Sequence, residues 1–178
     1  MSDRIPPELV QYADLVEQIA VPMGLDPSVV LSQIWTEVEQ FLSDDDPDNQ
    51  ETATRDERRW RYFYDPQRKR ALYDRTVSVD ENRARAQAIL DPQEFADQDN
   101  SWGLMQVMLA VAREYGFAGT PEELCDASVN ITIGCMHLDR CLARARGDVF
   151  AALCRYNGSP AYARKVLRRW EILKALEV

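Results

Sequence analysis

The chain has 178 residues and a formal charge of −9, because 30 acidic residues outnumber 21 basic ones. This length fits one domain with a hydrophobic core of its own, so we treat 1–178 as a single domain. A chain with a sequence pI near 4.7 is not built to coat nucleic acid, and no run approaches the ~20 apolar residues that cross a bilayer. We therefore expect no nucleic-acid partner and no membrane insertion.

The cysteines do not have the spacing of a metal site. None of them forms a CxxC pair, and only one histidine, His137, is available to complete a zinc set. The sequence also lacks a glycine-rich phosphate loop and a complete EF-hand pattern. We expect no metal, no cofactor and reduced thiols at Cys125, Cys135, Cys141 and Cys154.

The spacing of apolar residues predicts a mostly α fold. A proline pair at 6–7 precedes a first expected helix that runs to Ala20. Asp26 as N-cap and Pro27 at the first helical position open a second helix, which we expect to reach Phe41. We find no convincing strand alternation.

The stretch 42–100 differs from its flanks. Acidic residues dominate 41–57, whereas 58–75 is basic and alternates arginines with aromatic side chains. Such a patch can stack on sugars or nucleobases. The alternative is that the aromatic residues anchor an irregular insertion while the arginines pair with the preceding acids. A helix is expected at about 80–90.

Clear start and stop signals follow this stretch. A helix is expected from Asn100 or Ser101 through Tyr115, ending at Gly116. Further helices are expected to begin at the capping residues Thr120, Asp126 or Ser128, and Asp148, and a last one after the turn at 157–160.

Glu37 lies on the apolar face of the second expected helix. Val30, Ile34, Glu37 and Phe41 are three or four residues apart, the spacing that places side chains on one face. Because burial disfavours the charged form of a carboxyl, a glutamate in such a setting can hold a proton and act as a general acid. The alternative is an ordinary buried glutamate paired with an arginine. Glu39, two residues later, is expected to face water.

Two further segments combine polar groups with turn signals. Ser101-Trp-Gly-Leu-Met-Gln-Val-Met108 is expected to form the first turns of a helix. There, Gly103 allows close backbone approach, and the amide of Gln106 can hold an acetamido or hydroxyl group. Tyr156 and Asn157 place a phenol and an amide at the end of a helix.

In chain order, these segments resemble the soluble lytic transglycosylase domain of the lysozyme-like superfamily, whose members cleave peptidoglycan glycan strands. The resemblance covers about 10–42 and 100–165 and implies a lysozyme-like helical domain with a long insertion, about 42–100, after the catalytic helix. Trp60-Arg-Tyr-Phe-Tyr64 and Ser101-Trp102 also resemble phage-borne members. The matching motifs are Gly24-Leu-Asp-Pro-Ser before Glu37, Gly103-Leu-Met-Gln-Val-Met108, Asn130-Ile-Thr-Ile-Gly134 and Arg155-Tyr-Asn-Gly158.

The resemblance implies roles for single residues. Glu37 falls on the catalytic glutamate, and Asn130 matches a structural asparagine. The implied substrate-binding residues are Gln106 and Met108 in the glycan groove, Tyr156 beside the glutamate, Asn157 after it, and Ser101 as a candidate groove serine. The chain departs from the family in two ways: Val38 stands where a serine usually follows the glutamate, and the segment 38–102 is much longer.

As the resemblance implies, a lytic transglycosylase uses one glutamate twice. It protonates the leaving glycosidic oxygen and then removes a proton from the muramyl 6-hydroxyl, which attacks the anomeric carbon and leaves a 1,6-anhydro end. One alternative is a muramidase that admits water and uses Glu39, Asp97 or Asp99 as a second carboxylate. Another is a non-catalytic glycan-binding or virion structural module.

The resemblance to phage-borne members also bears on where the protein works. Because the first residues lack a signal-peptide pattern, we expect a phage endolysin that waits in the host bacterial cytoplasm before release to the periplasm and cell wall, or a virion-associated lysin. A fragment of a larger exported protein is the alternative. We expect a monomer that binds peptidoglycan glycan strands, with 42–100 folded over the glycan groove.

Overall fold

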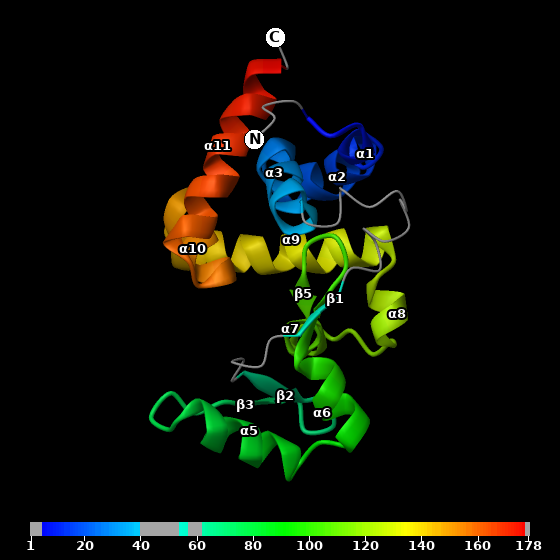
Figure 1. Ribbon diagram of the computed structural model, residues 1–178, viewed down its shortest axis with the longest axis vertical. Coiled ribbons are helices and arrows are strands. Elements are labelled where there is room, and N and C mark those ends of the chain that lie inside the picture. Colours follow the sequence, from blue (N-terminus) through cyan, green and yellow to red (C-terminus); the bar gives the residue numbers. More distant parts are fainter. Residues whose placement is uncertain (1–4, 40–53, 57–61, 177–178) are drawn as a thin grey trace.

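Figure 1 shows the computed structural model, which describes residues 5–39, 54–56 and 62–176. Helices dominate, so the prediction of a mostly α fold is confirmed. The chain forms an upper lobe of helices, a small sheet in the middle and a lower lobe built from the inserted segment.

The first expected helix is interrupted. It consists of α1 (Pro7–Val10) and α2 (Ala13–Ala20), followed by the 3-10 turn η1 (Val21–Met23). The next helix, α3 (Pro27–Val38), starts as predicted, because the side chain of Asp26 accepts a hydrogen bond of 2.8 Å from the backbone N–H of Ser28. It ends at Val38, and Phe41, the expected end, lies outside the described residues.

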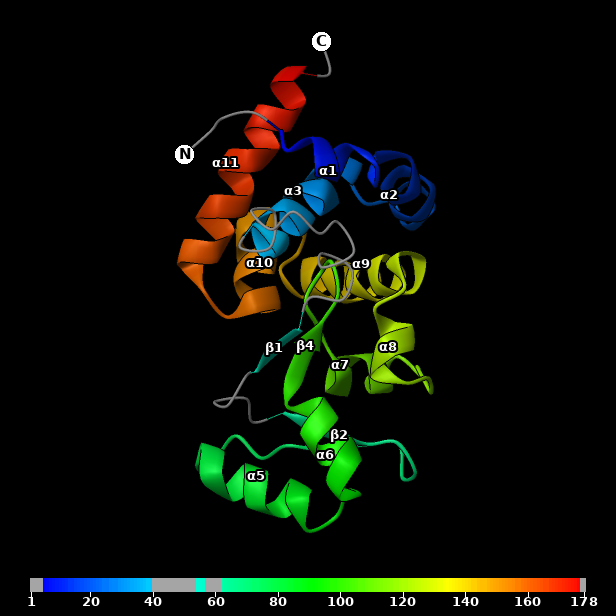
Figure 2. The same cartoon turned by 45° about the vertical axis from the view of Figure 1, so that its right-hand side comes forward.

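Four later helices contribute buried residues to the main core. They are α8 (Pro121–Leu124), α9 (Ala127–Arg144), α10 (Val149–Asn157) and α11 (Pro160–Leu176). The predicted starts at Thr120, Asp126 and Asp148 are confirmed, since each side chain caps its helix. Figure 2 shows α9 passing beneath α3, with α10 and α11 at its carboxyl-terminal end. Apolar side chains from these helices enclose the main core.

The segment around Gly103 is a hairpin, and the expectation that a helix begins at Asn100 or Ser101 is wrong. Strands β4 (Asn100–Trp102) and β5 (Val107–Met108) pair with each other, and β1 (Thr54–Asp56) adds to β4. Gly103 and Gln106 both have a positive φ, 71° and 46°, which a right-handed helix does not accept. The helix therefore starts only after the hairpin, as α7 (Leu109–Glu114).

The described part of the insertion folds around a small core of its own. It contains the antiparallel pair β2 (Phe63–Asp65) and β3 (Arg70–Leu72), followed by α5 (Val79–Gln87) and α6 (Pro92–Gln98). The helix expected at about 80–90 is confirmed, but the expected absence of strands is wrong. Alternation of apolar and polar residues did not predict these strands, because each strand has only three residues. The core of the lower lobe consists of Phe63, Leu72, Ala86 and Leu90, with Phe95 packed against it.

Apart from β1, which is a strand of the small sheet, the described part of the insertion lies below that sheet and not over the end of α3. This placement differs from the expectation that 42–100 covers the groove. A separate core explains the difference, since Phe63 and Leu72 are buried within the lobe and hold it together as a unit. Residues 40–53 and 57–61, including Trp60, lie outside the described residues.

Candidate active site

Glu37 occupies the last turn of α3. The residue is only 4% exposed, as its place on the apolar face predicted. In both views the tip of the β4–β5 hairpin lies near this end of the helix. The structure thus brings the glutamate close to the segment that the sequence singled out as a second part of the site.

A tyrosine from the last helix contacts Glu37. The hydroxyl group of Tyr162 donates a hydrogen bond to the Glu37 carboxylate and accepts one of 3.3 Å from Nε2 of Gln33. Burial, followed by the negative charge of Glu37, raises the pKa of Tyr162 well above its ordinary value, so the phenol stays protonated. Gln33 is fully buried one turn before Glu37. Tyr162 was not predicted as a site residue, because only the packing of the last helix brings it to Glu37.

Tyr156 also lies near Glu37, where the resemblance placed it. Its hydroxyl group donates a hydrogen bond of 3.1 Å to the backbone carbonyl of Met105 in the hairpin turn. Burial and then the charge of Glu37 raise the pKa of Tyr156 well above its ordinary value. The phenol is therefore a neutral donor that ties α10 to the hairpin beside the glutamate.

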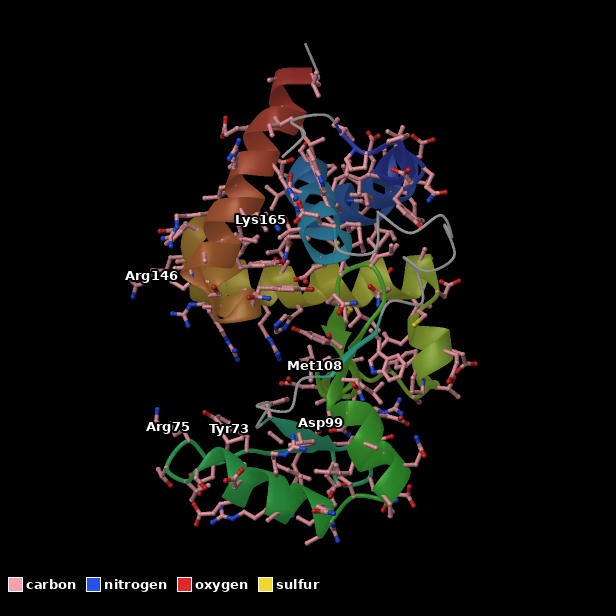
Figure 3. The ribbon with its side chains drawn as sticks, in the orientation of Figure 1. Tyr73, Arg75, Asp99, Met108, Arg146 and Lys165 are labelled. Carbon is pink, nitrogen blue, oxygen red and sulfur yellow. The ribbon has the colours of Figure 1, made fainter. Side chains whose placement is uncertain are left out.

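The polar side chains of the hairpin bind one another. Oγ of Ser101 donates a hydrogen bond of 2.9 Å to Oε1 of Gln106, and both residues are buried. Nε2 of Gln106 donates to the backbone carbonyl of Gly103 at 2.9 Å. These bonds close the turn, so Ser101 and Gln106 shape the hairpin. Met108, which is 8% exposed, lies on the sheet between the two lobes (Figure 3).

Asn130 holds the hairpin against α9. Its Oδ1 accepts a hydrogen bond of 2.8 Å from the N–H of Met105, and its Nδ2 donates to the carbonyls of Trp102 and Leu124 at 2.8 and 2.9 Å. A Cβ atom on Gly103 would lie 2.4 Å from Nδ2 of Asn130. The structure thus gives Asn130 the structural role that the resemblance implied, and it explains why glycine stands at position 103.

Asn157 is exposed at the carboxyl-terminal end of α10, where Gly158 caps the helix in the left-handed conformation. Its position leaves the side chain accessible to a ligand. Binding of substrate by Asn157 stays a prediction.

Glu39 does not simply face water, as the sequence predicted. It forms ion pairs with Lys165 and Arg169 of α11, while 35% of its side chain is exposed. Although partial burial opposes the shift, the hydrogen bond from Lys165 and the charges of both partners lower the pKa of Glu39. Glu39 lies off the core face, as the helical spacing predicted, but the spacing contains no information on α11 as a neighbour.

The two aspartates considered as a second carboxylate lie on the lower lobe. Asp99 follows α6 and binds Arg83, and Figure 3 shows it well below the level of α3. Asp97 accepts a hydrogen bond of 2.9 Å from Gln93, and burial raises its pKa. Neither belongs to the group of side chains that contact Glu37 in the described part of the structure.

The part of the chain that the structure describes contains no cluster of three or more His, Cys, Asp or Glu side chains arranged to hold a metal ion. Over the same residues, no helix has the length and apolar character needed to span a membrane.

The family model of the Transglycosylase SLT domain matches residues 77–175, more than half of the chain. An α-helical domain with this match is a lysozyme-like glycan-cleaving enzyme. The chain belongs to the Transglycosylase SLT domain family, which comprises peptidoglycan lytic transglycosylases. The match includes the hairpin, Asn130, Tyr156 and Tyr162, whereas Glu37 and the whole of α3 precede it. No curated protein and no solved structure matches the chain.

Proposed function

We propose that Glu37 is the single acid and base of this peptidoglycan lytic transglycosylase and that the product carries a 1,6-anhydro-muramyl end. The observation that carries the proposal is the position of Glu37: a buried carboxylate at the end of α3, bound by Tyr162 and adjacent to Tyr156. Tyr156 and Tyr162, which interact with this carboxylate, both belong to the matched family region.

In the first step, Glu37 donates its proton to the glycosidic oxygen as the bond from the muramyl C1 to that oxygen breaks. The substrate's acetamido group stabilises the positive charge at C1. Glu37 then accepts the proton of the muramyl 6-hydroxyl as its oxygen bonds to C1, so the enzyme ends in its starting protonation state. Because nucleophile and electrophile belong to the same sugar, the second step gains from proximity.

The surroundings of Glu37 favour this mechanism over a muramidase with two carboxylates. Inverting and retaining glycosidases need the second carboxylate within roughly 5–10 Å, across the scissile bond. Glu39 is bound to two cations of α11, and Asp97 and Asp99 belong to the lower lobe. Two polar neighbours of Glu37, Tyr156 and Tyr162, are phenols, which position a carboxylate without competing for its role.

Mass spectrometry of the muropeptides released from purified sacculi tests the proposal. A transglycosylase releases anhydro-muropeptides, each lighter by one water molecule than the product of hydrolysis. Products with a free reducing end would make the protein a muramidase. If the protein binds sacculi but releases neither product and does not lower their turbidity, it is a non-catalytic glycan-binding or virion structural module.

We further propose that the protein acts as a phage endolysin or a virion-associated lysin. The support is the resemblance of Trp60-Arg-Tyr-Phe-Tyr64 and Ser101-Trp102 to phage-borne members of the family. Expression inside a Gram-negative host, with and without a pore-forming holin, is the test. We expect lysis only when the holin gives the enzyme access to the cell wall.

A further inference from the structure

A line of side-chain contacts leads from Tyr156 toward the lower lobe. The ring of His137 lies 5.0 Å from the ring of Tyr156, and the ring of Tyr115 lies 6.2 Å from His137. Arg140 lies over the Tyr115 ring at 4.7 Å and donates two hydrogen bonds, of 2.7 and 2.9 Å, to the carboxylate of Glu114. All five residues are half-buried, so this line is part of the molecular surface as well as of the interior.

The line continues onto the β2–β3 pair. The hydroxyl group of Tyr62 donates a hydrogen bond of 2.7 Å to Glu114, and the ring of Tyr62 lies 6.1 Å from the ring of Tyr73. Leu72 points into the core of the lower lobe, so the neighbouring Tyr73 points away from that core. Tyr73 is 38% exposed, so part of its ring lies at the surface of the lower lobe.

Two exposed cations, Arg70 and Arg75, flank Tyr73 in the sequence. No described carboxylate forms an ion pair with either of them, whereas the neighbouring Arg68 and Arg85 each bind an aspartate. Figure 3 shows Tyr73 and Arg75 along the upper edge of the lower lobe, below Arg146 in this view. In a chain of net charge −9, cations without an ion pair among the described residues, next to an exposed aromatic ring, favour an acidic ligand that also has apolar faces.

We propose that Tyr73 and Arg75 bind the acidic stem peptide of the glycan strand that is cleaved at Glu37. This inference rests on the proposed function. A stem peptide carries free carboxylates for the guanidinium of Arg75 and aliphatic groups for the ring of Tyr73. The preferred substrate is therefore a glycan strand that still bears peptides, and the insertion gives this enzyme its preference.

Binding to the Glu37→Gln variant tests the inference without turnover. The ligands are soluble glycan strands with stem peptides and the same strands after an amidase has removed the peptides. In the Glu37→Gln background, Arg75→Gln should weaken binding of peptide-bearing strands by about three- to tenfold, and Tyr73→Ala by a similar factor. Neither change should alter the binding of peptide-free strands.

Lys174→Gln is the matched control, because it removes the same charge from the end of α11 at the opposite end of the molecule. It should leave the dissociation constants for peptide-bearing and for peptide-free strands unchanged. Added salt should reduce the preference of the protein with Arg75 for peptide-bearing strands. Equal losses on both ligands, or no loss in either variant, would overturn the inference. Since the readout is binding by an inactive variant, these outcomes are distinguishable from failure of the wild-type protein to produce anhydro ends.

Discussion

The hydrogen bond of 3.1 Å from the hydroxyl group of Tyr156 to the carbonyl oxygen of Met105 joins α10 to the β4–β5 hairpin. Met105 is also the residue whose N–H binds Asn130 of α9, at 2.8 Å. One hairpin residue is thus held by two helices, and the turn has little freedom to move away from the end of α3. The polar residues of the site hold one another in position through hydrogen bonds. We therefore expect some substitutions in and around the site to lower activity and others to lower the free energy of unfolding.

Tyr162→Phe should lower kcat by about ten- to a hundredfold with a smaller effect on KM. The change removes the donor to Glu37 and leaves the ring in place. Because that donor favours the ionised carboxylate, its loss should also move the alkaline limb of the pH–rate profile to higher pH. Rates on purified sacculi between about pH 4 and pH 9 check both effects.

Tyr115→Phe is a control for this change, since it removes a phenol that hydrogen-bonds the carbonyl of Met136 and not Glu37. An unchanged pH profile in Tyr162→Phe would show that the phenol does not act on the general acid.

Gly103→Ala should lower the free energy of unfolding by about 2–4 kcal/mol. Gly103 has a φ of 71°, and a Cβ atom there would lie 2.4 Å from Nδ2 of Asn130, which is held by its own hydrogen bonds. Urea unfolding followed by circular dichroism measures the change.

Gly147→Ala is the matched control for backbone strain. Gly147 has a φ of 84°, but no atom lies within 4 Å of the position of its Cβ. This variant should lose only about 1 kcal/mol, the cost of the left-handed conformation. Equal losses in the two variants would mean that the close approach to Asn130 contributes nothing.

Helix starts could be predicted because they depend on local chemistry. Asp26, Thr120, Asp126 and Asp148 all cap helices where the sequence placed them, since a cap needs only neighbouring backbone N–H groups. The hairpin at Gly103 was missed because its stability comes from Asn130, which is distant in sequence. The pattern of neighbouring residues in the sequence contains no information on a partner so far along the chain.

The candidate site, too, could be predicted only in part from the sequence. The burial of Glu37 follows from spacing along one helix, and the resemblance placed Tyr156 beside it. Tyr162 and the partners of Glu39 were not predicted, because both depend on how α11 packs against α3. The phase of a helix shows which side chains face inward, but it does not identify the neighbouring helix.

His137 should make the protein less stable as the pH falls below about 6.5. Burial and the nearby charge of Arg140 lower the pKa of His137 to about 4, so the folded protein resists its protonation. Between about pH 6.5 and pH 4 the unfolded chain binds a proton that the folded chain does not, and the contribution of this residue falls by as much as about 3 kcal/mol. His137→Gln removes that proton and should reduce the dependence of Tm on pH in this window. Parallel Tm curves for the two proteins would contradict the assignment.

Glu37→Gln should abolish glycan cleavage while the fold and substrate binding persist. Glutamine keeps the size of the acid but has no transferable proton, so we expect a loss of about 100- to 10,000-fold or more. Glu39→Gln is the comparison. It should retain most of the activity but lower the unfolding free energy by about 1 kcal/mol, because Arg169, whose side chain is 6% exposed, loses its anionic partner. Activity on sacculi together with circular dichroism and thermal unfolding gives both readouts. If Glu39→Gln were inactive and Glu37→Gln active, the catalytic carboxylate would be the one bound to Lys165 and Arg169, and the roles of the two glutamates would be reversed.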